Sequence, residues 1–445
     1  MLYPVYLCRM NKRTIAFHHF GCKVNFAETS ALSRQFQEKG FEILDFHLRA
    51  DIYVISTCVV TAIAEKKCRA AIRQAHKLNP QAKIAVIGCF PELKPTELLQ
   101  MEGVDLVLGH EEKFELFNEI EKLDHTDDYH GRLACEKKTP SPGFVPSFSY
   151  GDHTRSFLKI QDGCDYYCSY CTIPFARGHS RSDTIENVLN NVGEIIRHNI
   201  KEIVLTGVNI GDFGRHQGET FESLIKALDK AEGISRFRIS SIEPDLLNDE
   251  IIQIVASSDT FLPHFHIPLQ SGSDKVLKAM HRKYTTSLFA SRVNKIKSLM
   301  PYACIAADVI VGFPGESEED FREMVDFIQA TDLSYLHVFS FSKRENTLAA
   351  KMDLMIPEQV KRERSQILHT LSNEKKKDFY HQNQGRIENV LFESDNSGGF
   401  MHGFSGNYLR VKTPFQSNLI NQIKKVILKK VDDDGTFLIN IIDDK

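Results

Sequence analysis

The 445-residue chain has no apolar run of about 18 residues, the length that a membrane-spanning helix requires. It also lacks an excess of positive charge: the formal net charge is -4 at pH 7, which argues against a protein that binds nucleic acid over its whole surface. Any contact with RNA must therefore come from local clusters of basic residues. The first ten residues have no charged segment before their short apolar stretch and no clear cleavage site, so they do not predict a secretory signal.

The chain has ten cysteines, which do not look like a disulfide framework because the chain is far too long to need such crosslinks. A reducing cytosol fits them better, and we expect a cytoplasmic location. The length suggests about three domains at roughly 150 residues each. The hydrophobic content of 42% is enough for each domain to form a core.

Three of these cysteines, Cys164, Cys168 and Cys171, form a CxxxCxxC triplet. A 4Fe-4S cluster usually takes four cysteine ligands, so a three-cysteine loop leaves one iron open to another molecule. A zinc knuckle and a redox CxxC pair are the alternatives. A closed zinc site needs a fourth ligand, for which His179 is the only near candidate, so the ligand count favours the iron-sulfur cluster.

The first part of the chain, residues 12–127, alternates between strand and helix patterns. Short apolar or β-branched runs at 14–19, 51–57, 83–88 and 104–108 precede helical patterns at 28–39, 61–77, 94–100 and 111–122. This alternation predicts an α/β domain with a parallel, doubly wound sheet.

Three further cysteines follow the first three predicted strands: Cys22, Cys58 and Cys89. Because parallel strands end at one edge of a sheet, where ligands bind, these thiols are expected to converge. The alternative is three small buried side chains, since free cysteine is among the most buried residue types. The shared position favours ligands, and we predict a second, auxiliary 4Fe-4S cluster with one open iron.

Four other cysteines share no such position: Cys8, Cys68, Cys135 and Cys304. We expect them in the core or on the surface, without a ligand role.

With its two cysteine sets in this order, the chain resembles the methylthiotransferases, a branch of the radical S-adenosylmethionine (SAM) superfamily. Tyr170, just before the last cysteine of the triplet, is part of the resemblance. The resemblance implies that the open iron of the triplet's cluster chelates SAM and that reduction releases a 5′-deoxyadenosyl radical. It further implies that one SAM molecule gives a methyl group to a sulfur held at the auxiliary cluster, and that another makes the radical.

Two segments look most like the subfamily that modifies tRNA carrying N6-threonylcarbamoyladenosine: Gly21-Cys22-Lys23-Val24-Asn25 and Thr57-Cys58-Val59-Val60-Thr61. The implied reaction installs a methylthio group at C2 of this adenosine, next to the anticodon. Adenine C2 offers no acidic proton, so a radical is needed. The implied partners are the tRNA anticodon stem-loop, an external electron donor and a sulfur donor.

The sequence also allows other substrates and another class of protein. Within the same branch, the substrate is alternatively isopentenyladenosine in tRNA or an aspartate of a ribosomal protein. Outside it, the alternative is a non-catalytic iron-sulfur protein that binds RNA or transfers electrons, which the ordered SAM segments below argue against.

Prolines and serines at 140–149 predict a linker over residues 128–150. Strand patterns then recur at 157–160, 202–206, 237–241, 264–269, 305–311 and 335–341. Six strand-helix units are too few for a full eight-stranded barrel, so we predict a partial (βα)6 barrel over residues 151–378, as the radical SAM resemblance also implies.

After a charged helical stretch at 357–380, the remaining residues, 379–445, are β-like. They resemble the small TRAM β-barrel that contacts RNA. The pairs Lys424-Lys425 and Lys429-Lys430 are its candidate phosphate contacts. A purely structural cap is the alternative.

Turns at the carboxyl ends of the barrel strands are where barrel chemistry lies. By resemblance, the SAM contacts beside Tyr170 come from Gly207, Asn209, Ser241, Glu243, Gln270, Val309, Ile310 and Gly312.

Basic residues next to the cysteines are candidates for binding the substrate. Arg177 and Arg181 follow the triplet, and a planar guanidinium suits a phosphate or carboxylate. If the nucleoside carries a carboxylate, we expect a cation beside it, with Arg177 or Lys23 favoured. The alternative for this loop is a solvated surface. Two strand histidines, His266 and His337, are predicted to be core residues rather than ligands.

Overall fold

The computed structural model describes residues 12–59, 62–124, 132–134, 143–151 and 154–442. The chain divides into two compact units, residues 1–142 and 143–445, and each is described by itself. Of the predicted linker, residues 128–131 and 135–142 lie outside the described residues. Its other residues include the short strands β6 (Arg132–Ala134) and β7 (Ser147–Phe148). In the described part of the chain, no helix is both long and apolar enough to cross a bilayer.

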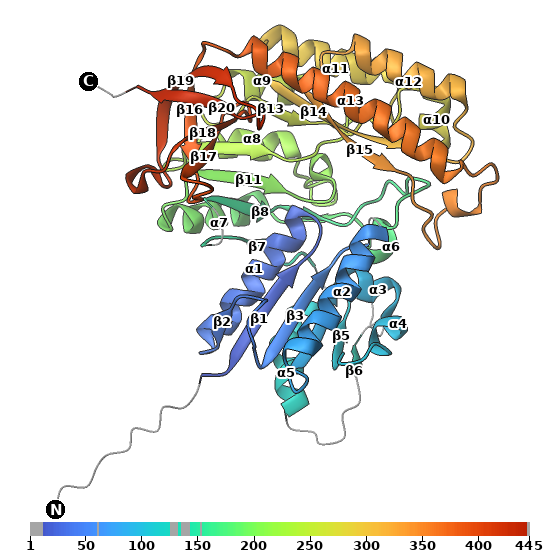
Figure 1. Ribbon diagram of the computed structural model, residues 1–445, viewed down its shortest axis with the longest axis vertical. Coiled ribbons are helices and arrows are strands. Elements are labelled where there is room, and N and C mark those ends of the chain that lie inside the picture. Colours follow the sequence, from blue (N-terminus) through green and yellow to red (C-terminus); the bar gives the residue numbers. More distant parts are fainter. Residues whose placement is uncertain (1–11, 60–61, 125–131, 135–142, 152–153, 443–445) are drawn as a thin grey trace, which may run out of the picture. The chain divides into compact units, whose positions relative to one another are not determined.

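The first unit is built on a six-stranded sheet whose strand pairs are all parallel (Figure 1). The strands are β1 (Thr14–His19), β2 (Glu42–Leu44), β3 (Ile52–Thr57), β4 (Lys83–Gly88), β5 (Leu106–Leu108) and β6. The α-helices are α1 (Lys23–Glu38), α2 (Ala62–Leu78), α3 (Cys89–Leu93), α4 (Pro95–Leu99) and α5 (Leu116–Asp124). The predicted parallel, doubly wound sheet is thereby confirmed.

The strand order of this sheet is β2-β1-β3-β4-β5-β6. The chain first winds from β1 to β2 on one side and then returns to the other side of β1, so the winding direction reverses between β1 and β3. In open α/β sheets, such a switch point leaves a crevice at the carboxyl ends of the two strands, and ligands bind there. Cys22 and Cys58 follow these two strands.

The second unit contains a partial barrel of six strands with helices outside (Figure 1). The strands are β8 (Arg155–Lys159), β11 (Glu202–Thr206), β12 (Arg236–Ile239), β13 (His264–His266), β14 (Cys304–Val311) and β15 (Tyr335–Ser340). The α-helices between and after them are α6 (Ile173–Arg177), α7 (Ile185–Arg197), α8 (Phe221–Leu228), α9 (Asp249–Ser257), α10 (Asp274–Ala279), α11 (Thr286–Leu299), α12 (Glu318–Ala330) and α13 (Glu358–Gln382). Parallel bridges Phe237–Phe261 and Ser241–His266 join the two three-stranded halves, and β7 pairs antiparallel with β8.

Alternating side chains of these strands divide the barrel into two environments. Ala307, Val309 and Val311 of β14 pack in the same buried cluster as residues of α7, α11 and α12. The intervening residues, Asp308 and Ile310, are only partly buried. One face of the strands therefore forms the core with the helices, and the other lines the inside of the open barrel, as the period of two along a strand requires.

The chain ends in a closed five-stranded barrel with the order β16-β17-β18-β20-β19, consistent with a TRAM domain. Its strands are β16 (Ile387–Phe392), β17 (Phe400–Ser405), β18 (Arg410–Pro414), β19 (Ile423–Val431) and β20 (Phe437–Ile441). The fold class predicted from the sequence is thus confirmed in all three parts. Several short strands were not predicted, among them β2, β6, β7 and β17.

Two arginines of β12, in the six-stranded barrel, donate hydrogen bonds to the backbone of the small barrel. Arg236 donates hydrogen bonds to the carbonyl oxygens of Asn389 and Phe404, at 2.7 and 3.2 Å. Arg238 donates to the carbonyl oxygen of Gly406 at 3.1 Å, and its Nε donates to Glu202 Oε1 at 2.8 Å. Glu202 is fully buried and is the shared counter-charge of both arginines.

We expect Glu202→Gln to lower the free energy of unfolding by about 3–5 kcal/mol at pH 7, because the variant leaves buried arginines without their counter-charge. Burial alone would raise the pKa of Glu202, but Arg238, with Arg155 and Arg236, holds it below its usual value. A depressed folded-state pKa contributes stability above the unfolded pKa of about 4.3, and this is lost as the pH falls. The difference between variant and wild type should therefore shrink as the pH falls below about 4.3.

Urea unfolding followed by circular dichroism at pH 7 and at about pH 3, which is below the unfolded pKa, measures this difference. The matched control is Glu222→Gln, which removes a solvent-exposed pair with Lys226 and should change stability by less than about 1 kcal/mol. Equal effects of the two substitutions, or an effect of Glu202→Gln that grows as the pH falls, would contradict the prediction.

Candidate functional site

The CxxxCxxC triplet lies in a loop between two short antiparallel strands at the end of β8, β9 (Gln161–Asp162) and β10 (Arg181–Ser182). The loop begins at Gly163, whose φ of +69° is in the left-handed region. A Cβ atom at this position would lie 1.9 Å from the carbonyl oxygen of His179. Only glycine fits there, so Gly163 allows the two ends of the loop to approach each other closely.

Each of the three thiols receives a hydrogen bond. The backbone N–H of Tyr166 donates to Cys164 Sγ at 3.4 Å, and that of Ile173 donates to Cys171 Sγ at 3.5 Å. The guanidinium of Arg282 donates to Cys168 Sγ at 3.0 Å. Donors directed at sulfur suit thiolates that carry negative charge in a cluster.

Burial determines the protonation of these thiols when no metal is bound. It raises the pKa of the Cys164 and Cys171 thiols to about 12. Both are therefore protonated at neutral pH, and only a cation held among them would deprotonate them. The triplet thus fits a positively charged metal cluster, with its hydrogen-bond donors already in place.

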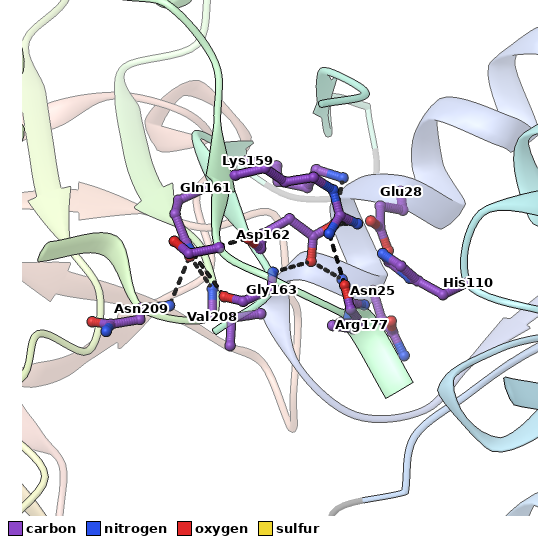
Figure 2. Close-up of polar contacts among 12 residues, drawn as sticks. Asn25, Glu28, His110, Lys159, Gln161, Asp162, Gly163, Arg177, Val208 and Asn209 are labelled. Carbon is purple, nitrogen blue, oxygen red and sulfur yellow. Dashed lines mark hydrogen bonds and ion pairs between the residues drawn. The ribbon is translucent and has the colours of Figure 1, made fainter. Parts of the chain in front are cut away.

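Gln161 connects this loop to the next strand end, as Figure 2 shows. Its Oε1 accepts hydrogen bonds from the backbone N–H groups of Val208 and Asn209, at 2.9 and 2.7 Å. Its Nε2 donates to the carbonyl oxygen of Gly163 at 2.8 Å. A Cβ atom at Gly207 would lie 2.9 Å from Gln161 Oε1, so the glycine is needed for this close approach.

The Asn209 side chain fits a role in binding a polar ligand. The residue is 3% exposed, and neither its Nδ2 nor its Oδ1 has a hydrogen-bond partner. A buried amide without partners costs on the order of 1–3 kcal/mol. Its position beside the triplet loop is therefore explained if a bound molecule completes its hydrogen bonds, which is the chemistry expected of SAM.

The other proposed SAM contacts lie on the following strand ends of the barrel. Ser241 and Glu243 follow β12, and burial raises the pKa of the Glu243 carboxyl to about 7. Gln270 has a φ of +63°, and its carbonyl oxygen accepts a hydrogen bond from the N–H of Ile310. Val309 is fully buried in the core, which leaves only its backbone for a contact.

Gly312 closes this series after β14. Its φ is +75°, and its N–H donates to Glu316 Oε2 at 2.9 Å. All eight proposed barrel contacts therefore lie in the carboxyl-terminal half of a barrel strand or beyond its end, from β11 to β14.

Basic residues before and after the triplet surround the carboxylate of Asp162, and Figure 2 shows two of them, Lys159 and Arg177. Arg177 donates to Asp162 Oδ1 at 2.8 Å, and Lys159 and Arg181 approach Asp162 Oδ2 at 3.1 and 3.4 Å. Arg177, Lys159 and Asp162 are almost completely buried. Contact of Arg177 with a substrate would compete with this ion pair, whereas Arg181 is 19% exposed and Lys23, in the first unit, is partly buried.

The first unit brings its three proposed ligands to one edge of its sheet. Gly21 lies against Cys58, because a Cβ atom there would be 2.5 Å from Cys58 Cβ and 2.9 Å from its Sγ. Gly88 likewise lies against the carbonyl oxygen of Thr57. Both glycines have a φ of +103° and directly precede Cys22 and Cys89.

Side-chain hydrogen bonds connect the same three strand ends. Asn25 Nδ2 donates to the carbonyl oxygens of Phe20 and Thr57, at 3.0 and 2.8 Å. Thr57 Oγ1 donates to the carbonyl oxygen of Ile87 at 2.8 Å. The ends of β1, β3 and β4 are therefore held together, and a proposed cysteine ligand follows each of them.

The predicted core positions of the remaining cysteines and of the two strand histidines agree with the structure only in part. Cys68 and Cys304 are fully buried, as the core hypothesis predicts, and Cys8 and Cys135 lie outside the described residues. The prediction of core histidines is wrong for His337, which is exposed on β15. Its side chain shares the barrel-lining face with Asp308, its partner in the strand register, rather than the face packed on helices.

His266 is only partly buried as well. Its Nε2 lies 2.7 Å from Asp308 Oδ1, so it is held by a polar partner inside the barrel rather than packed in the apolar core.

The sequence pattern missed Gln161 and Arg282 as members of the site. Arg282 lies 114 positions after Cys168, the thiol to which it donates. The segment MHRKYT contains no pattern that would have marked it.

Comparison with known proteins settles which family has this arrangement. Residues 158–328 match the radical SAM superfamily, and residues 14–109 match the uncharacterised protein family UPF0004. The chain is 39% identical over 436 residues to a threonylcarbamoyladenosine tRNA methylthiotransferase of Bacillus subtilis, covering 94% of each chain. The chain belongs to the radical SAM methylthiotransferase family. It is therefore a transferase, and this family implies SAM and a 4Fe-4S cluster as cofactors.

A relative of a second kind is more distant from this methylthiotransferase. It is a tRNA-2-methylthio-N(6)-dimethylallyladenosine synthase of Syntrophus aciditrophicus, 31% identical over 87% of this chain and 85% of the relative. A solved radical SAM methyltransferase, TsrM from Kitasatospora setae, aligns with a TM-score of 0.54 at 14% identity, covering 74% of this chain and 72% of TsrM. This last similarity concerns the fold alone.

Proposed function

We propose that this methylthiotransferase installs a methylthio group at C2 of N6-threonylcarbamoyladenosine next to the anticodon of tRNA. The single observation that carries the proposal is the 39% identity, over 94% of both chains, to a relative named for this substrate. The two cysteine sets support the reaction class, since the triplet loop and the switch-point edge of the first sheet each offer three thiols.

The residues of the second unit have separate proposed roles at the cofactor. Cys164, Cys168 and Cys171 hold the SAM-binding 4Fe-4S cluster, and the chemistry that a bound cluster supplies there is one-electron reduction of SAM. Asn209 offers an unsatisfied amide to SAM, and Gln161 keeps the 207–209 turn next to the cluster loop. Glu243, with its raised pKa, offers a carboxyl group at the same end of the barrel.

The first unit is proposed to be the sulfur platform, which holds the sulfur atom that is methylated and then transferred. Cys22, Cys58 and Cys89 hold the auxiliary 4Fe-4S cluster in this proposal, at an edge shaped by Gly21, Gly88 and the Asn25 amide. An external electron donor and a sulfur donor complete the reaction. The boundaries proposed for the parts are 12–127, 128–150, 151–378 and 379–445.

The small C-terminal barrel is the proposed contact for the anticodon stem-loop. On β19, Val426 and Leu428 point into the barrel, while Lys425 and Lys429 are exposed on the opposite face. Positive side chains in a row on one strand suit an RNA phosphate backbone. The site of action on tRNA supports a cytoplasmic location as part of the proposal.

We expect an anticodon stem-loop carrying threonylcarbamoyl to be converted at least tenfold faster than one carrying isopentenyl when the two compete. A site that pairs a carboxylate leaves its cation unpaired when an apolar group enters, and such mismatches discriminate strongly. Mass spectrometry of the nucleosides from an equimolar mixture gives both rates in one experiment.

Lys23→Met tests the proposed cation in the same competition. The variant keeps the length of the side chain and removes its charge, so the preference for threonylcarbamoyl should fall. Arg197→Met, a substitution on α7, is the control. Comparable or faster turnover of the isopentenyl substrate by the wild type would overturn the proposed substrate and leave the reaction class intact.

A further inference from the structure

Arg282 makes more contacts with the proposed cofactor site than the donation to Cys168 alone. Its Nη1 lies 3.4 Å from Tyr170 Oη, and its Nε donates to Tyr284 Oη at 3.1 Å. Its Nη2 is paired with Glu243, and the side chain is 3% exposed. One buried guanidinium therefore bridges a cluster-binding thiol and a carboxylate on a barrel strand end.

The end of α10 delivers this arginine to the cluster loop. The N–H of Arg282 donates to the carbonyl oxygen of Leu277, and that of His281 donates to the carbonyl oxygen of Lys278. Together with the φ of +58° at His281, these bonds form a Schellman motif, which ends the helix and reverses the chain.

The cluster loop docks on the same helix end. The N–H of Ser169 donates to the carbonyl oxygen of Met280 at 3.0 Å, and its Oγ donates to that of Ala279 at 2.9 Å. The position of the guanidinium relative to Cys168 is therefore determined by backbone bonds on both sides and not by a free side chain.

A second contact keeps the guanidinium in one orientation. Tyr284 Oη donates to the carbonyl oxygen of Pro268 at 2.6 Å, so the tyrosine that accepts from Arg282 is itself fixed to the turn after β13. A side chain that merely filled space would not need four polar partners. An arginine is also always charged, so its burial beside a thiol places a permanent positive charge there.

This charge has a direct consequence for electron transfer. The reduction potential of an iron-sulfur cluster depends on its net charge and on hydrogen bonds to its sulfur ligands. Reduction adds one negative charge to the cluster, so a nearby cation and an N–H···S bond stabilise the reduced form more than the oxidised form. Removal of the cation must then make the cluster harder to reduce.

We propose that Arg282 is a positioning residue that raises the reduction potential of the SAM-binding cluster through its hydrogen bond to Cys168, held in register by Glu243 and Tyr284. The inference rests on the 4Fe-4S cluster that the family implies, and it is independent of which nucleoside is the substrate. The residue makes the one-electron reduction that precedes SAM cleavage accessible to a weaker donor.

The test is a redox titration with dithionite of the anaerobically reconstituted full-length protein without tRNA, followed by electron paramagnetic resonance. The signal of the SAM-binding cluster is the one that changes when SAM is added. In Arg282→Gln, the ratio of reduced to oxidised cluster at a fixed potential should fall about tenfold, a shift of the midpoint by ~59 mV to more negative values for a one-electron couple.

Two further variants keep the test decisive. Arg282→Lys retains the positive charge but lacks the planar guanidinium with its several N–H donors. The midpoint potential of its cluster should therefore lie between those of wild type and Arg282→Gln. Arg292→Gln removes another arginine-carboxylate pair of the same unit, with Asp249, and should titrate like the wild type.

The outcomes separate a tuning role from a structural one. If both Arg282 variants hold iron and titrate at the wild-type midpoint, the proposal is wrong. If neither holds the cluster, Arg282 is needed for assembly alone and the proposal is equally wrong. If only Arg282→Lys holds iron, its midpoint decides: a negative shift supports the proposal and a wild-type value overturns it.

Discussion

Replacing Cys164, Cys168 and Cys171 together by alanine is expected to remove about half of roughly eight irons and to abolish reductive cleavage of SAM. The expectation follows from the proposal that each of the two three-cysteine sets holds one 4Fe-4S cluster. Without the triplet, the buried loop keeps its backbone donors but has no thiol to receive a metal. Iron analysis after anaerobic reconstitution and the yield of 5′-deoxyadenosine with SAM and dithionite measure the two effects.

The control for this prediction is Cys304→Ala, which removes a fully buried thiol of the same unit that has no place in the site. Its iron content and its yield of 5′-deoxyadenosine should equal those of the wild type. A wild-type iron content in the triple variant would contradict the proposal that these cysteines hold a cluster. Loss of all iron would show that the two sites are not independent.

Replacing Cys22, Cys58 and Cys89 by alanine is expected to spare reductive cleavage of SAM and to stop transfer of the methylthio group completely. The physical reason is that the two proposed cluster sites, one for the radical and one for the sulfur, belong to separate units of the chain, each with its own core. Nucleoside mass spectrometry of modified tRNA, run beside the assay for 5′-deoxyadenosine, measures the two activities in one sample.

Cys68→Ala is the matched control, because this thiol lies in the same unit, is fully buried in α2, and has its pKa raised to about 12 by burial. It should form product at the wild-type level. Methylthiolated nucleoside from the triple variant would rule out the auxiliary cluster as the sulfur platform.

The strands were the most predictable elements of the fold. β1, β4 and β11 have the predicted bounds, because each is a short β-branched run between a polar start and a glycine or polar stop. α1 begins at Lys23, five residues before the predicted start. Its first turn contains Asn25, whose side chain is bonded to Phe20 and Thr57, so tertiary contacts and not apolar periodicity determine where this helix starts.

The ion-pair partner of Arg177, one of the proposed substrate cations, could not be predicted from the sequence. Arg177 was expected to meet a substrate because it follows the triplet, but its guanidinium is bonded to Asp162. The sequence contains both residues, 15 positions apart. It does not indicate that the β9–β10 ribbon turns back and brings them together.

By itself, the sequence determined the two proposed sets of cysteine ligands and the chemistry that they suit. Cluster ligation by a CxxxCxxC loop is a local property of spacing, and cysteines placed after parallel strands share an edge in any such sheet. Tertiary structure alone decided the switch point, because the three-residue strand β2 is too short to show a pattern and yet reverses the winding of the sheet. It also decided the partners of Cys168 and of the 207–209 turn, Arg282 and Gln161, which are 114 and 47 positions away along the chain. Hydrogen bonds over such separations depend on where the backbone places each side chain, and no local pattern records that.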